Sequence, residues 1–150
     1  MLRLWLRRCT IASAIAIWGT TANAAILDCV ATDWTAGYTD TDWVAKHVAG
    51  LYKIDPERSP PDMNVWLKWD TDRGTWVGFG CQHPSMWRCE VTPRFYRRTE
   101  LEKSGPESTL TIDRQSGVIV YDNNYPEDVN FRVRGQCKIG VEPETAAPKF

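Results

Sequence analysis

The chain has little histidine and lacks the short motifs that mark common catalytic sites. Its 150 residues include 2 histidines and contain no Gly-x-Ser-x-Gly nucleophile motif, no phosphate-binding glycine loop and no Cys-x-x-Cys redox pair. Glycosidases use paired carboxylates, but no pattern singles out two of the 19 Asp and Glu residues. We therefore expect a non-enzymatic protein. A small secreted hydrolase that uses His83 as an acid–base group is the alternative.

Long apolar runs are also absent, except near the N-terminus. There Arg3, Arg7 and Arg8 accompany an apolar run over Cys9–Gly19, and Ala22-Asn23-Ala24 forms an A-x-A cleavage site. The run is too short to span a bilayer. The pattern predicts a signal peptide over residues 1–24, and a periplasmic or secreted protein with no membrane anchor after cleavage.

Removal of 24 residues from 150 leaves 126, which is the size of one domain. We expect a single domain over residues 25–140 and a flexible tail over residues 141–150. The chain has 18 basic and 19 acidic residues, and the signal peptide takes three arginines, so the exported form carries a net charge of about −4. This charge disfavours nucleic acid as a partner and fits a cationic one.

Four cysteines remain in the exported form, and in an oxidising compartment they predict two disulfides. We expect Cys81–Cys89 to staple a chain reversal and Cys29–Cys137 to join the first strand to the last, although other pairings stay open. Seven residues separate Cys81 from Cys89, and His83 is the one nearby histidine, which disfavours a zinc site. No cofactor or metal is predicted.

Alternating hydrophobicity predicts strands along most of the chain. The clearest case is "VNFRVRGQCKI", residues 129–139, whose odd-numbered residues, including Cys137 and Ile139, are expected in the core opposite a cationic outer face. Residues 109–121 and 65–78 read as hairpins that turn at 115–117 and 70–74. Residues 70–74 also begin like a calcium loop, but its later ligands are missing.

The remaining segments are less regular. Residues 26–31 and 89–91 predict short strands, and Pro93 indicates an edge or bulge after the second one. Residues 40–47 have helical spacing, and a strand is expected from about Val48. We interpret "PRFYRRTELEK", residues 93–103, as a solvated strand end. Together these segments predict an all-β antiparallel meander of about eight strands, as an up-and-down barrel or, alternatively, a β-sandwich.

Tryptophan is unusually frequent, with 8 residues, of which Trp5 and Trp18 belong to the signal peptide. Trp66 and Trp69 lie on opposite faces of one strand, so one of them should be exposed to a partner or covered by a loop. We therefore expect a Trp-rich binding surface next to the stapled turn. Its residues would be His83, Met86, Trp87 and Arg88, with Trp66 or Trp76.

These features favour an exported binding protein. One form would bind or inhibit a cationic secreted protein such as a lysozyme. A lipocalin-like carrier of a small apolar ligand and an assembly subunit of the cell envelope are the alternatives. The oligomeric state stays open.

Overall fold

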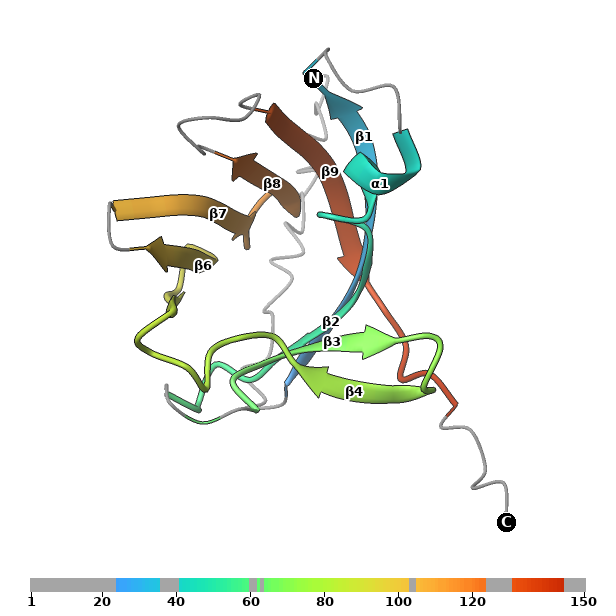
Figure 1. Cartoon of the computed structure of the whole chain (residues 1–150). Helices are drawn as coiled ribbons and strands as arrows, with labels where there is room; N and C mark the ends of the chain where they lie inside the picture. The colour runs from blue at the N-terminus through green and yellow to red at the C-terminus, as the bar shows by residue number, and fades with distance from the viewer. Residues whose placement is uncertain are drawn as a thin grey trace, which may run out of the picture.

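The computed structural model describes residues 24–35, 41–59, 62, 64–102, 105–123 and 131–144. These residues form a single antiparallel sheet with one short helix (Figure 1). The elements are β1 (Ala25–Trp34), α1 (Thr41–Ala45), β2 (Gly50–Ile54), β3 (Trp66–Asp70), β4 (Thr75–Gly78), β5 (Trp87–Val91), β6 (Phe95–Glu102), β7 (Gly105–Asp113), β8 (Val118–Asn123) and β9 (Phe131–Ile139). Residues 1–23 of the expected signal peptide and 145–150 of the tail lie outside the described residues. Within the described ranges, no helix is long and apolar enough to cross a membrane.

Strands that are consecutive in the chain are neighbours in the sheet, except for β4 and β5. The order is β4-β3-β2-β1-β9-β8-β7-β6-β5, so β1 pairs with β9 while β4 and β5 form the two edges. The sheet curls into a half-barrel (Figure 1), and no ladder joins its edge strands β4 and β5. The all-β meander is confirmed, with nine strands rather than about eight, and the single sheet matches the barrel-like expectation better than the sandwich.

Strand β9 shows the alternation that its sequence predicts. Phe131, Val133, Gly135 and Cys137 are buried, and the residues between them are exposed. The expectation that Ile139 also faces the core is wrong, because its side chain is 67% exposed. It occupies the last position of β9, where the strand ends at the rim of the sheet.

The disulfide between Cys29 and Cys137 joins β1 to β9, as expected. The two residues lie directly opposite each other in the β1–β9 ladder, and both are buried. A link between the first and last strands is possible because these strands are neighbours in a curled meander.

Both expected hairpin turns are present. The carboxylate of Asp70 accepts hydrogen bonds of 3.0 Å from two backbone N–H groups of its turn, and Asp113 does the same at 2.8 and 3.0 Å. Each turn ends with a glycine at positive φ, 60° for Gly74 and 71° for Gly117. The motif of residues 70–74 is thus a self-capped turn, because its first carboxylate is already bonded to the backbone.

The region predicted to contain a helix at 40–47 and a strand from about Val48 does contain both elements, α1 and β2. Helix α1 carries Val44 into the core, and one turn later Val48 is also buried. The strand was expected from Val48, but β2 begins at Gly50. The reason is that the backbone N–H groups of Val48 and Ala49 still donate to the Ala45 carbonyl, at 3.1 and 2.8 Å, and so continue the helical turn.

Strand β6 corrects the interpretation of residues 93–103 as a solvated strand end. It is an eight-residue strand between β5 and β7, and it places Tyr96 in the core with 4% exposure. Pro93 lies in the turn between β5 and β6, where it does not interrupt a ladder. Strand β5 is an edge of the sheet, as Pro93 suggested.

Candidate functional site

The stapled loop, residues Cys81 to Cys89, connects the two edges of the half-barrel. Its disulfide is present, so neither thiol is free to bind a metal. The His83 carbonyl accepts the N–H groups of Met86 and Trp87 at 2.9 and 2.8 Å, and the His83 N–H donates to the Gly80 carbonyl at 3.0 Å. The loop is therefore fixed both covalently and by its own backbone. Across the described residues, no group of three or more His, Cys, Asp or Glu side chains could hold a metal ion.

Gly80 allows the loop to pack closely against the sheet. Its φ is +93°, a conformation that L side chains rarely adopt, and a Cβ there would lie 2.9 Å from Cγ of Trp87. Only glycine permits the loop backbone to pass this close to the indole. The ring of Trp87 is consequently half-buried beneath the loop.

On the open side of the half-barrel, Arg98 bridges the two edges. Its guanidinium lies 3.6 Å from the Trp87 ring centroid on β5 and 3.8 Å from the Phe79 ring centroid just after β4. These two stacked contacts take the place of a β4–β5 hydrogen-bond ladder. Burial lowers the pKa of Arg98 to about 10, and its Nε has no hydrogen-bond partner in the described part of the chain.

Lys68 adds a second cation to the interior near the Phe79 ring. Its Nζ lies 5.3 Å from the Tyr52 ring centroid and 5.6 Å from that of Phe79, and it donates to the Lys46 carbonyl at 3.1 Å. Burial, and then the charge of Arg98, lowers the pKa of Lys68. The interior beside the loop is thus aromatic and positively charged.

The residues expected to bind a partner fall into three environments. His83, Met86 and Arg88 are exposed on or beside the stapled loop, and Met86 is 53% exposed. Trp87 is half-buried against Arg98. Trp66 is completely buried, so it does not contribute to the outer surface.

Trp76 lies on the outer face of the β3–β4 hairpin. It faces Trp69 at a centroid distance of 5.3 Å, and its Nε1 donates to Glu142 at 2.7 Å. Lys53 also donates to Glu142, at 3.1 Å. The start of the segment expected to be a flexible tail is therefore attached to the sheet.

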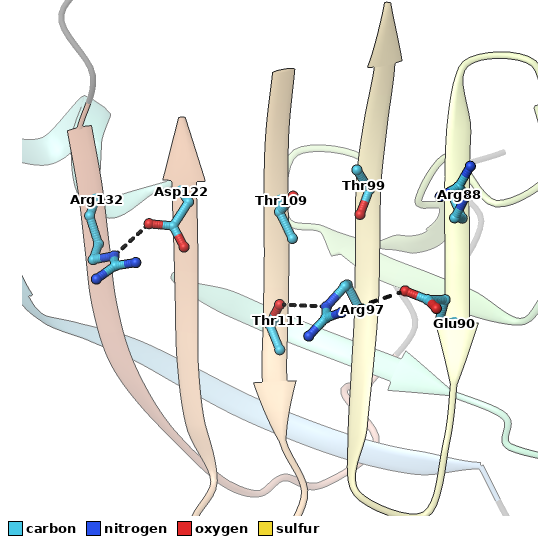
Figure 2. Close-up of a pocket in the computed structure, with 8 residues that line it drawn as sticks. All are labelled: Arg88, Glu90, Arg97, Thr99, Thr109, Thr111, Asp122 and Arg132. Atoms are coloured by element: carbon cyan, nitrogen blue, oxygen red, sulfur yellow. Dashed lines mark hydrogen bonds and ion pairs between the residues drawn. The ribbon is translucent and has the colours of Figure 1, made fainter. Parts of the chain in front are cut away.

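A separate polar depression, the outer hollow, lies on the convex face of β5 to β9. Its volume is about 510 Å³, and it opens widely to solvent. Side chains from all five strands point into it (Figure 2). The lining residues are Arg88, Glu90, Arg97, Thr99, Thr109, Thr111, Asp122 and Arg132.

The strand register explains why these residues meet. Successive ladder pairs place Arg88 opposite Thr99, Thr99 opposite Thr109, Thr109 opposite Asp122, and Asp122 opposite Arg132. One row of side chains therefore crosses all five strands on the outer face, as Figure 2 shows. Asp122 and Arg132 form an ion pair at one end of this row.

A second, shorter row lies beside the first. The Arg97 guanidinium approaches Glu90 at 3.8 Å and donates from Nε to the Thr111 hydroxyl at 3.3 Å. The sequence analysis included Arg88 among the expected binding residues, but it did not predict the hollow. The reason is that the sequence analysis did not predict the strand at 95–102. That strand carries Thr99 and places β5 and β7 on its two sides.

Comparison with protein-family models, with curated proteins and with solved structures gave no match, so function has to be inferred from the chain's own residues.

Proposed function

We propose that this chain is an exported, non-enzymatic binding protein that contacts a protein partner through its stapled loop. The supporting observation is an ordered loop that presents an exposed apolar side chain, Met86, next to the exposed His83. Because the loop is already held by its disulfide, association would not have to order it, which lowers the entropic cost of binding. The two disulfides are consistent with an oxidising extracellular compartment.

The partner we favour is a cationic secreted enzyme with carboxylates in its cleft, such as a lysozyme. The exported chain would carry a net charge of about −4, which attracts a cationic protein over long range. At the contact itself, the loop carries His83 and Arg88 and has no acidic residue. Such a loop suits a cleft in which two carboxylates flank the reacting bond.

The described geometry supports the alternatives less well. The imidazole of His83 makes no hydrogen bond or ion pair with any described residue, whereas an acid–base histidine is commonly oriented by a second group. A carrier of an apolar ligand would need an apolar, unfilled interior. Here Trp66 and Tyr52 fill the core, and Arg98 and Lys68 bring charge into it.

The test is a binding and inhibition screen with purified protein that begins at Ala25. A panel of cationic secreted enzymes, including several lysozymes, is immobilised for surface plasmon resonance, and lysis of bacterial cell walls is followed by turbidity. We expect at least one enzyme to bind and to be inhibited. Met86→Ser should weaken that binding by about tenfold, as expected for an apolar anchor at an interface centre.

A matched control removes an exposed apolar side chain elsewhere. Val141 is 82% exposed and lies outside the loop, so Val141→Ser should leave affinity unchanged. Absence of binding to every enzyme of the panel, or an equal loss in both variants, would overturn the proposal.

A further inference from the structure

The outer hollow contains some polar side chains that make no hydrogen bond or ion pair with the described residues. We propose that it binds a short oligosaccharide carrying carboxylate groups, as a second ligand site that adjoins the stapled loop and shares Arg88 with it. The site is built from side chains of β5 to β9, which the ladder register holds in two parallel rows (Figure 2).

The floor of the hollow supplies hydroxyl groups. Thr99 is only 8% exposed, yet its hydroxyl makes no hydrogen bond to any residue in the described ranges. Thr109 lies directly opposite on β7, and its hydroxyl is likewise without a partner there. Neither oxygen is among the fully buried polar atoms that lack a partner, so both hydroxyls are accessible from the hollow and can donate to or accept from a ligand there.

The cations of the hollow differ in their availability. Arg97 and Arg132 are each close to a carboxylate, at Glu90 and Asp122 respectively. The side chain of Arg88 forms no ion pair or hydrogen bond within the part of the chain that is described. Its guanidinium, at the β5 end of the row, can therefore bind a ligand carboxylate in two-pronged fashion.

The two carboxylates restrict the class of ligand. Glu90 and Asp122 lie in the same hollow as the arginines, so a densely charged anion such as phosphate or nucleic acid would be repelled as well as attracted. Carboxylates and threonine hydroxyls are instead good acceptors for sugar hydroxyl groups. A ligand with many hydroxyls and widely spaced carboxylates matches both sets of groups.

The length of the site favours a chain of several sugars. The row runs across five strands, and four spacings of about 4.8 Å place its ends roughly 19 Å apart along the sheet. A single sugar ring would contact only part of this row. A linear oligosaccharide lying across the strands would reach from Arg88 to the Asp122–Arg132 pair.

Isothermal titration calorimetry with defined tetrasaccharides tests this inference. The probes are tetramers of galacturonic, glucuronic and mannuronic acid, with a neutral glucose tetramer, inorganic phosphate and a tetraglutamate peptide as comparisons. We expect at least one uronic acid tetramer to bind. Arg88→Gln should weaken that binding by about tenfold and Thr99→Val by about fivefold, as for loss of a charged and of a neutral hydrogen bond.

Two control variants separate binding in the outer hollow from a general effect of surface charge and from binding at the stapled loop. Arg73 is a surface arginine of the β3–β4 turn, and Arg73→Gln should leave binding unchanged, although it removes the same charge. Met86→Ser, which tests the stapled loop, should also leave it unchanged. The inference is overturned if no uronic acid tetramer binds, if phosphate or tetraglutamate binds as tightly, or if Arg73→Gln weakens binding as much as Arg88→Gln does.

Discussion

The two disulfides of this chain close loops of very different length, and their removal should therefore have unequal effects on stability. Cys29 and Cys137 are 108 residues apart, whereas Cys81 and Cys89 are 8 apart. In the chain-entropy model a cross-link stabilises the fold by restricting the unfolded chain, and the effect grows with the logarithm of loop length. That model gives about 4.8 kcal/mol for the long loop and about 2.6 kcal/mol for the short one.

The perturbation is a pair of double variants, Cys29→Ala/Cys137→Ala and Cys81→Ala/Cys89→Ala. Urea unfolding followed by circular dichroism should show the first losing about 2 kcal/mol more than the second. In a chain of this size that difference corresponds to a melting temperature lower by roughly 6–10 °C. Marginal stability could leave the first variant partly unfolded at room temperature, in which case the thermal midpoint gives the comparison.

An equal or reversed order of the two variants would refute the reasoning from chain entropy. The short-loop variant should retain the far-ultraviolet spectrum of the intact protein, because β5 remains paired with β6 over five residue pairs. The lower stability of Cys81→Ala/Cys89→Ala relative to the intact protein would then come from the loss of the short cross-link alone. Loss of the whole sheet signal in that variant would show that the half-barrel depends on the staple.

Three further changes test particular contacts. Arg98→Ala should cost about 2–3 kcal/mol in urea unfolding and shift tryptophan emission to longer wavelength, because the Trp87 ring loses its stacked partner; an unchanged spectrum would contradict this role. Burial lowers the pKa of His47 below 6.5, so as the pH falls His47 binds a proton in the unfolded chain before it does so in the folded one. The stability contribution of His47 is therefore complete above about pH 6.5 and is lost as pH falls through the lower folded pKa, and His47→Gln should reduce this loss in urea titrations at successive pH values. Gly80→Ala should lower the free energy of unfolding by about 2–3 kcal/mol, because residue 80 has a positive φ and its new Cβ would clash with the Trp87 indole. Gly74→Ala, at φ 60° without such a clash, should cost only about 1 kcal/mol. Equal costs would exclude the close approach to Trp87 as the cause.

Much of the fold can be read from local patterns. The alternation of residues 131–138 reflects a strand with one buried and one solvated face, and the aspartate–glycine turns carry their own hydrogen bonds. The pairing of Cys29 with Cys137 follows once the first and last strands are taken as neighbours. These features depend on short-range chemistry, which a single sequence contains in full.

The parts that could not be predicted depend on contacts between distant segments. Residues 95–102 carry four charged side chains in eight positions, so their pattern resembles a solvated segment. The structure places Arg98 of this segment inside, because Phe79 and Trp87 stack on its guanidinium. Such a burial cannot be inferred from β6 alone.

The candidate site shows the same division. The stapled loop and its exposed residues His83, Met86 and Arg88 follow from cysteine spacing and turn chemistry. The outer hollow does not, since it exists only when the register aligns Thr99 with Thr109 across two strands. Trp66 was included in the expected surface because its strand alternates, but alternation alone does not reveal which face is buried.

The intact mass of the exported protein, denatured without reductant, tests the central claim most directly. An exported binding protein with an oxidised stapled loop should give a chain that begins at Ala25 and weighs about 4 Da less than the fully reduced form, because each of two disulfides removes two hydrogens. A chain that retains residues 1–24, or one with all four thiols free, would contradict both the export and the rigid loop on which the proposed function depends.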